Sequence, residues 1–251
     1  MKLCGINIKC HHHDELFQVS DDVKIVVTVN SEAIVRSQTD IKLKNIINNS
    51  LTTIDGQIPL WLFRLKYRRS DVEKISGSEL IYTLPEFAAH KNLRVFLLGG
   101  KEDSNSESVL RLKKLYAGLQ ISGYSPPYSP YPFSSEINES IFNHIASIHP
   151  QILFVGFGMG KQEFWAYDNI DRLSNLGVKL IIGCGGSFEF ASGKIKRAPK
   201  IIQNIGMEGI WRLLCEMKWF RFKRLLLSSK IFYFFLVDIF SKRNENKLTH
   251  N

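Results

Sequence analysis

Short runs of apolar, mostly β-branched residues recur along the chain, and longer segments with helical periodicity separate them. The apolar runs predict β-strands over residues 24–28, 51–54, 93–98, 151–155 and 178–182. The periodic segments predict helices over residues 31–49, 58–66, 76–90, 104–116, 135–148 and 161–171. Because strands that alternate with helices form parallel sheets covered on both faces, we expect an α/β fold with a mostly parallel, Rossmann-like sheet flanked by helices.

Local signals set some of the element boundaries. Ser76 and Glu79 have the spacing of a capping box, and so do Ser104 and Glu107, so each serine is predicted to cap the start of a helix. Residues 124–133 hold four prolines, which predict a loop because proline fixes its own φ and has no backbone N–H to donate.

The pattern changes after Met207. Residues 211–240 contain no proline or glycine and predict a nearly continuous helix in which Arg221 and Arg224 share one face. The apolar run within it, residues 231–237, is far shorter than the roughly 20 residues that cross a bilayer. A basic, aromatic helix of this kind favours a position in the lipid headgroup region, and a core helix with a solvated basic face is the alternative.

The distribution of charge follows the same division. The 251-residue chain carries a net charge of +9, and residues 190–251 alone hold 13 Lys and Arg against 4 Asp and Glu. The other 189 residues hold 20 charged residues of each sign, so the excess indicates an anionic partner for the C-terminal quarter rather than a generally basic protein. No nucleic-acid partner is expected. We therefore expect an α/β domain, residues 1–206, and a basic amphipathic helical appendage, residues 207–251, that faces an anionic membrane surface.

The cysteines and histidines argue for reduced thiols and against a metal site. The cysteines, at positions 4, 10, 184 and 215, lack metal-ligand spacing and follow no secretory signal, which indicates a cytosolic protein. Three adjacent histidines, His11 to His13, cannot easily converge on one ion, so a polar loop is favoured over a metal site there.

Three of the predicted strands end in closely spaced glycines. These are Gly99, Gly100, Gly156, Gly158, Gly160, Gly183, Gly185 and Gly186. Glycine lets the backbone turn sharply and approach a ligand, and the carboxyl edge of an open α/β sheet is where ligands bind. The pattern predicts a site for a nucleotide or another phosphorylated ligand, with ordinary turn chemistry as the alternative. The G-x-G-x-x-G and P-loop fingerprints are absent, so the residues alone leave the ligand class open.

Eight short motifs stand in a fixed order along the chain. They are V-T-V-N-S-E at 27–32, I-D-G at 54–56, I-S-G-S-E-L at 75–80, V-F-L-L-G-G at 95–100, P-Q-I-L-F-V-G-F-G at 150–158, K-Q-E at 161–163, G-C-G-G-S-F-E-F-A-S-G-K-I-K-R-A-P at 183–199 and W-R-L-L at 211–214. Together they resemble the WecG/TagA/CpsF family of glycosyltransferases, which build bacterial cell-envelope polysaccharides on a polyprenyl-diphosphate carrier. The resemblance runs from Val26 to about Leu225, and Gly160 stands where members of the family usually have proline.

The resemblance implies an inverting glycosyltransferase. Its members move a sugar, often N-acetylmannosamine, from a UDP-sugar donor to a polyprenyl-diphosphate-linked sugar, as in teichoic acid or exopolysaccharide assembly. It implies that Asp55 is the base that takes the acceptor's proton and that Thr28 and Asn30 orient the carboxylate or the donor sugar. The implied substrate-binding residues are Asn30, Gly56, Gly77, Ser78, Gly99, Gly100, Gly156, Gly158, Lys161, Gln162, Glu163, Gly185 and Gly186. Without the resemblance, Asp55-Gly56 is an ordinary turn, Asn30 a helix cap, and Lys161 and Glu163 helix-start residues.

The resemblance also implies how the leaving diphosphate is stabilised. The chain has no D-x-D motif for a metal, so no cofactor or metal is expected, and arginines would contact the phosphates. The candidates are Arg197, Arg212, Arg221 and Arg224. We expect a peripheral protein on the cytoplasmic face of the bacterial plasma membrane, with a homo-oligomer left open. Two alternatives stay open as well, a non-catalytic nucleotide-binding module that docks on membranes and, less favoured without the fingerprint, an NAD-dependent oxidoreductase.

Overall fold

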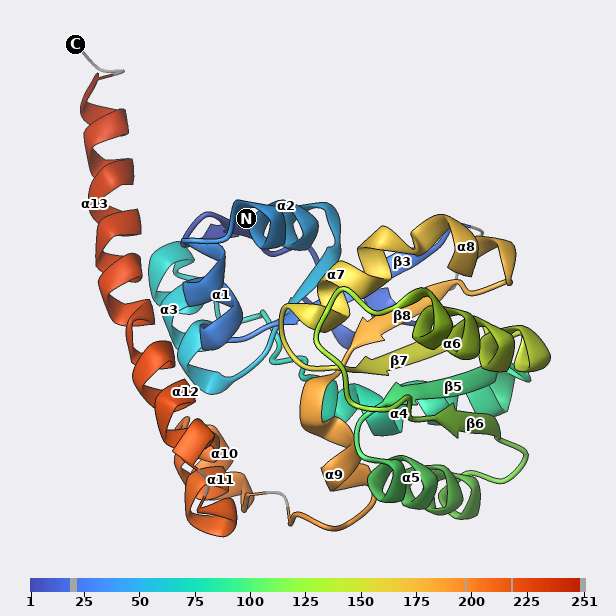
Figure 1. The fold of residues 1–251 in the computed structure, drawn as a ribbon. Helices are drawn as coiled ribbons and strands as arrows, with labels where there is room; N and C mark the ends of the chain where they lie inside the picture. Colours follow the sequence, from blue (N-terminus) through green and yellow to red (C-terminus); the bar gives the residue numbers. More distant parts are fainter. Residues whose placement is uncertain (19–21, 197, 218, 249–251) are drawn as a thin grey trace. The chain divides into compact units, whose positions relative to one another are not determined.

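The computed structural model describes residues 1–18, 22–196, 198–217 and 219–248. Six parallel strands form the central sheet and helices flank it, which confirms the predicted α/β fold (Figure 1). The strand order is β4-β3-β8-β7-β5-β6. The strands are β3 (Lys24–Val29), β4 (Leu51–Ile54), β5 (Arg94–Gly99), β6 (Gln120–Tyr124), β7 (Ile152–Gly156) and β8 (Leu180–Gly183).

The chain forms two compact units, and neither is a continuous stretch of sequence. The first unit comprises Met1–His13, Val29–Ile75 and Ala198–Asn251, and the second comprises Asp14–Thr28 and Ser76–Arg197. The expected division between residues 206 and 207 stays a prediction.

The second unit contains most of the sheet. Its helices are α4 (Gly77–Lys91), α5 (Glu102–Leu115), α6 (Ser135–Ile148), α7 (Lys161–Asp168), α8 (Ile170–Asn175) and α9 (Phe188–Ala191). Because parallel strands are joined by right-handed crossovers, α5 lies on one face of the sheet and α6, α7 and α8 lie on the other (Figure 1). Trp165, Phe96 and Phe154 are fully buried in the core between these layers.

The first unit is mainly helical. A short antiparallel hairpin, β1 (Lys2–Leu3) and β2 (Ile6–Asn7), precedes α1 (Ser31–Ser37), α2 (Ile41–Asn49) and α3 (Gln57–Tyr67). The C-terminal segment adds α10 (Lys200–Asn204), α11 (Glu208–Glu216), α12 (Trp219–Ser229) and α13 (Ile231–Leu248). Helix α1 contacts α2, α12 and α13. None of the helices within the described ranges is both long and apolar enough to cross a membrane.

Two long helices expected from the sequence are broken in the structure. The prediction of one helix over residues 31–49 is wrong, because Asp40 starts α2 by accepting a hydrogen bond from the backbone N–H of Leu43 (2.9 Å). The nearly continuous helix over residues 211–240 is wrong as well. Met217 ends α11 in the left-handed region (φ 46°), and α11 then packs on α12. Gly209 permits this contact, since a Cβ there would lie 2.7 Å from Leu225 Cδ2.

Other boundaries differ in smaller ways. Strand β6 was not predicted. Ser76 does cap α4, but its hydroxyl lies 3.1 Å from the Ser78 hydroxyl and accepts no capping hydrogen bond. Helix α5 begins at Glu102, so the predicted cap at Ser104 is wrong, and the Ser104 side chain is buried inside the helix.

Candidate functional site

The first candidate site lies at the switch point of the sheet in the second unit. Strands β5 and β7 are adjacent, with Gly99 paired to Gly156, but the helices that follow them lie on opposite faces. Ligands of open α/β folds bind in the crevice outside the strands at such a point. A pocket of about 640 Å³ opens there, lined by Gly99, Gly100, Gly156, Phe157 and Lys161 among others.

Two aromatic rings explain why three of the pocket residues are glycines. A Cβ on Gly99 would lie 2.7 Å from the Phe157 ring, and a Cβ on Gly100 or Gly156 would lie 2.6 or 2.7 Å from the Phe188 ring. Gly99 and Gly100 also have positive φ values of 88° and 72°. The glycines therefore serve both the turn and the close approach of the rings, and of the three only Gly100 is exposed.

The proline-rich loop forms one wall of this pocket. The Ser125 hydroxyl donates to the carbonyl of Gly99 (2.9 Å). Lys161 Nζ donates to the carbonyl of Ser129 (2.9 Å) and lies 4.7 Å from the centre of the Tyr128 ring. The Tyr131 hydroxyl donates to Asp168 (2.5 Å), and burial together with this bond raises the pKa of Tyr131. Lys161 is thus tied to the loop at the wall of a pocket that two lysines, Lys101 and Lys161, and two glutamates, Glu102 and Glu189, line.

Gln162 and Glu163 are buried beneath the glycine loops. Gln162 Oε1 accepts from the backbone N–H groups of Gly158 (3.2 Å) and Gly185 (3.1 Å), and its Nε2 donates to Glu163 Oε1 (2.8 Å). Glu163 Oε2 accepts from the N–H of Gly160 (2.7 Å), where φ is +92°. The structure thus places Gln162, expected to contact the nucleotide, where it joins the loops after β7 and β8.

Replacing Gln162 by leucine is expected to lower the free energy of unfolding by about 2 kcal/mol or more. The change leaves two half-buried backbone N–H groups without their acceptor, and because an unsatisfied buried group costs roughly 1–3 kcal/mol, we expect about the lower value for each of the two. Urea denaturation would measure the loss. Gln120→Leu, at an exposed position on β6, is the matched control and should change stability by less than about 0.5 kcal/mol. Equal effects of the two substitutions would contradict the proposed bracing of the loops.

The remaining glycine-loop residues lie around the end of β8. Gly77 starts α4 and is buried against this loop, since a Cβ there would lie 3.2 Å from Cys184 Cα. Ser78 follows it in the first turn of α4. Gly185 is half-buried and Gly186 is exposed. Burial raises the pKa of the Cys184 thiol, which keeps it protonated and poorly nucleophilic.

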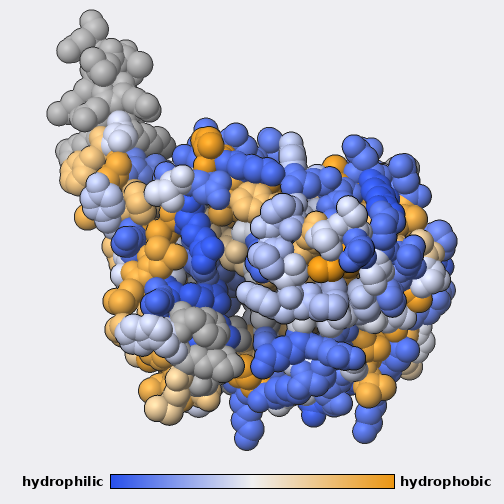
Figure 2. Space-filling model, in the orientation of Figure 1, coloured by the Kyte–Doolittle hydropathy of each residue, from blue (hydrophilic) through white to orange (hydrophobic). Residues whose placement is uncertain are grey.

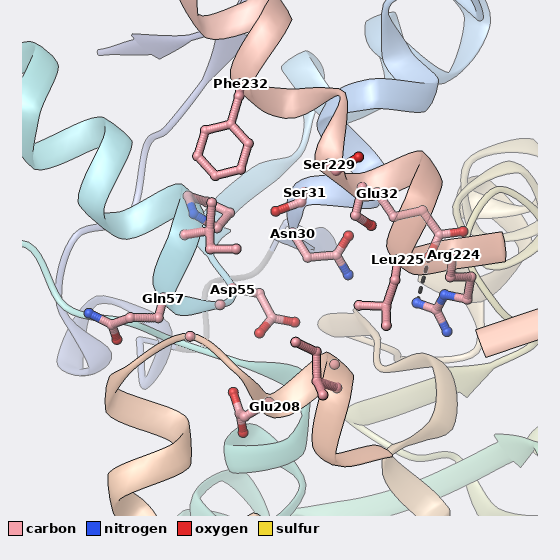
Figure 3. Close-up of a pocket in the computed structure, with 17 residues that line it drawn as sticks. Asn30, Ser31, Glu32, Asp55, Gln57, Glu208, Arg224, Leu225, Ser229 and Phe232 are labelled. Atoms are coloured by element: carbon pink, nitrogen blue, oxygen red, sulfur yellow. Dashed lines mark ion pairs between the residues drawn. The ribbon is translucent and has the colours of Figure 1, made fainter. Parts of the chain in front are cut away.

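The second candidate site lies within the first unit, where β4 ends. Asp55 follows β4, and its backbone N–H donates to the carbonyl of Val29 (2.9 Å). Gly56 then adopts φ 92° and precedes the first residue of α3, so the chain turns sharply at Asp55. A pocket of about 460 Å³ opens here, and the Asp55 carboxylate lies at its centre (Figure 3).

The pocket combines polar and apolar walls from distant segments. Its described lining residues are Asn30, Ser31, Glu32, Asp55, Gly56, Gln57, Ile58, Pro59, Gly206, Glu208, Gly209, Ile210, Arg224, Leu225, Ser228, Ser229 and Phe232. Asn30 caps α1 by accepting from the N–H of Ala33 (3.0 Å). Thr28 is not among the lining residues. It belongs to the second unit, where its buried hydroxyl donates to the carbonyl of Gly183 (3.5 Å).

The candidate arginines have different positions. Arg224 lines the Asp55 pocket and forms an ion pair with Glu32 (2.5 Å), which is buried and also pairs with Arg36 (2.7 Å). Arg221 is half-buried on α12 and is not among the described lining residues. The side chain of Arg212, on α11, and the whole of Arg197 lie outside the described residues. Sequence reasoning missed Glu32 because only its i,i+4 spacing to Arg36 is visible in the chain.

The histidine cluster has an acidic partner. His13 Nδ1 lies 3.0 Å from Glu73 Oε2, and His12 Nδ1 lies 3.8 Å from Glu73 Oε1. The hydrogen bond with His13 lowers the pKa of Glu73. Within the described ranges, no three His, Cys, Asp or Glu side chains are grouped so that they could hold a metal ion.

Comparison with known families gives a match over nearly the whole chain. A family model described as the glycosyl transferase WecG/TagA/CpsF family matches residues 1–246. The matched range includes the glycine-lined pocket of the second unit and the Asp55 pocket of the first.

Proposed function

The chain belongs to the WecG/TagA/CpsF glycosyltransferase family of cell-envelope polysaccharide synthesis, and from this premise we propose that it transfers a sugar from a UDP-sugar to a polyprenyl-diphosphate-linked sugar with inversion. The observation that carries the proposal is the Asp55 carboxylate at the centre of a pocket that an arginine also lines. The donor sugar is N-acetylmannosamine or a related hexose.

The chemistry assigned to Asp55 is general base catalysis. The carboxylate takes the proton of the acceptor hydroxyl as its oxygen attacks the anomeric carbon of the donor. The bond from that carbon to the UDP oxygen breaks, and UDP leaves with the electron pair. Asn30, whose side chain caps α1 at the pocket wall, holds the wall in place.

The glycine-lined pocket of the second unit is the proposed nucleotide site. Its volume of about 640 Å³ falls in the range of pockets that hold small ligands, and it lies at the carboxyl ends of β5 and β7, where the exposed Gly100 forms part of its lining. Tyr128, Phe133 and Phe157 supply aromatic surface for a base, and Lys161 supplies positive charge.

Arginine is the proposed counter-charge for the diphosphate. Arg224 is the candidate whose side chain lines the Asp55 pocket. Its planar guanidinium offers five N–H donors, which suit phosphate oxygens. Developing charge on the leaving phosphate can be stabilised in this way without a metal ion.

Adding EDTA is therefore expected to leave the transfer rate unchanged. The expectation rests on the lack of a D-x-D motif and on the arginine in the pocket. Initial rates with and without chelator measure it, with a metal-dependent glycosyltransferase assayed in parallel as the control. A loss of activity that Mg²⁺ or Mn²⁺ restores would contradict the arginine model.

The C-terminal helices are the proposed membrane contact on the cytoplasmic face. On α13, Ile231 and Phe235 are buried and Asp238 accepts hydrogen bonds from the N–H of Cys4 (2.8 Å) and from Lys66 Nζ (2.5 Å). Because these contacts occupy one side of α13, the apolar residues on its other side face outward. The exposed ones on α11 to α13 and their junctions are Ile210, Leu214, Met217, Trp219, Phe222, Leu226, Phe232, Tyr233, Leu236, Val237 and Phe240. Figure 2 shows hydrophobic side chains gathered over these helices, at the left of the view. Exposed apolar surface beside basic residues suits an anionic lipid surface.

The test of the proposed function is a panel of UDP-sugars offered with a prenyl-diphosphate-linked sugar acceptor. Mass spectrometry of the lipid product should show one added sugar for one UDP-sugar of the panel. No added sugar from any donor would contradict the proposal.

A further inference from the structure

Glu32 is one of two further acidic residues that line the pocket, with Glu208, and its role differs from that of Asp55. Glu32 lies in the first turn of α1, is only 4% exposed, and forms ion pairs through both carboxylate oxygens. Oε1 pairs with Arg36 on the same helix, and Oε2 pairs with Arg224 on α12 (Figure 3). The two arginines are far more exposed, at 45% and 41%.

This difference in burial makes Glu32 the fixed member of the group. The Glu32 side chain is shorter than that of arginine and is buried, so it has few accessible rotamers, and the N-terminal end of α1 favours its negative charge. Arginine has a long side chain that loses much rotamer entropy when it is held in one place. A buried carboxylate without partners is costly, so the pair with Arg224 joins α12 to α1.

We propose that Glu32 is a positioning residue that holds the Arg224 guanidinium at the pocket wall, ready to bind the donor diphosphate. Glu32 engages one terminal nitrogen of Arg224, Nη2, whereas a guanidinium has five N–H donors in all, which is more than one carboxylate oxygen can use. The inference rests on the proposed function for the role of Arg224. The two possible roles of Glu32 have opposite effects on UDP affinity. A carboxylate that merely competed with phosphate for the arginine would weaken UDP binding, whereas a positioning carboxylate strengthens it.

The experiment compares UDP binding to full-length variants by titration calorimetry. Glu32→Gln keeps the shape of the side chain and removes its charge, and it is expected to raise the Kd for UDP roughly tenfold. Arg36→Gln is the matched control, since it removes the other ion pair of the same carboxylate but does not line the pocket; it should change the Kd less than about twofold. In an Arg224→Gln background, Glu32→Gln should have no further effect on the Kd.

Hydrogen exchange of the α12 amides supplies a readout that does not depend on UDP. Faster exchange over α12 in Glu32→Gln is expected, because the ion pair that joins α12 to α1 is lost. This readout reports how far α12 is loosened, separately from the change in UDP affinity. Faster exchange with an unchanged or lower Kd for UDP would overturn the positioning role. If Arg224→Gln alone leaves the Kd unchanged, the proposed function of Arg224 fails instead.

A second variant covers the case in which Glu32→Gln does not fold. Glu32→Asp keeps the charge but withdraws the carboxylate by one methylene group, so UDP binding should weaken by a smaller factor than in Glu32→Gln. Wild-type affinity in Glu32→Asp together with wild-type α12 exchange would overturn the inference.

Discussion

Replacing Asp55 by asparagine is expected to lower kcat by roughly 10²-fold or more, which is the usual scale for a lost general base, while the affinity for UDP changes little. The amide has nearly the shape of the carboxylate, so the turn at Gly56 and the pocket should be kept. What it cannot do is accept the proton of the acceptor hydroxyl. Turnover at saturating donor and acceptor, together with the Kd for UDP, measures the two parts of this expectation.

The same pocket offers a matched control. Glu208 lines it as Asp55 does, lies 3.8 Å from Lys74 and starts α11. Glu208→Gln makes the same chemical change at a position to which no catalytic role is assigned, and it should keep kcat within a few fold. Full turnover in Asp55→Asn would contradict the assignment of the base and favour a module that binds nucleotides without catalysis. If Glu208→Gln were the inactive variant, Glu208 would be the base.

The strands of the sheet could largely be predicted from the sequence, because four of them are buried on both faces and read as continuous apolar runs. Strand β6 was missed because most of it is not buried. Of its five residues, only Ile121 is buried, and Gly123 accommodates the Asn105 side chain, so the pattern lacks an apolar run. Strand β4, at the other edge of the sheet, has three buried residues and was predicted.

The broken helices lack the usual glycine and proline signals. Between α1 and α2 the sequence has neither residue, and the same holds between α11 and α13. The first break has a weaker local signal, the Asp40 cap of α2, which sequence analysis overlooked. The break after α11 depends on tertiary contacts such as the packing of α11 on α12 at Gly209, and contacts of this kind override helix propensity.

The features of the candidate site also divide into those that the sequence could predict and those that it could not. Asp55 and Gly56 follow a strand, so their place at a sharp turn was expected from position alone. The ion pair of Glu32 with Arg224 was not expected, because it joins residues about three quarters of the chain apart. The resemblance implied that Gln162 contacts the nucleotide, but its amide oxygen already accepts from the N–H groups of Gly158 and Gly185.

Truncation after Gly206 is expected to abolish most of the transfer activity and to release the protein from anionic membranes. The truncation removes α11 to α13, and with them Arg224, Leu225 and Phe232 from the walls of the Asp55 pocket. It also removes the exposed apolar residues of these helices and most of the positive charge of the chain's last quarter. The sheet and the glycine-lined pocket consist of residues before this point, so we expect the truncated protein to stay folded.

Liposome co-sedimentation separates the membrane contribution from the loss of Arg224. Each basic residue near an anionic surface contributes about 1 kcal/mol within a Debye length, so binding of the full chain should need anionic lipid and weaken with salt. A full-length variant with Trp219 and Tyr233 replaced by glutamine changes exposed residues that do not line the pocket, and it should lose membrane binding while keeping its Kd for UDP. Truncated protein with normal turnover on a lipid acceptor would show that the helices are packing elements alone. Binding that resists high salt and does not need anionic lipid would show that apolar contact, not charge, attaches the appendage.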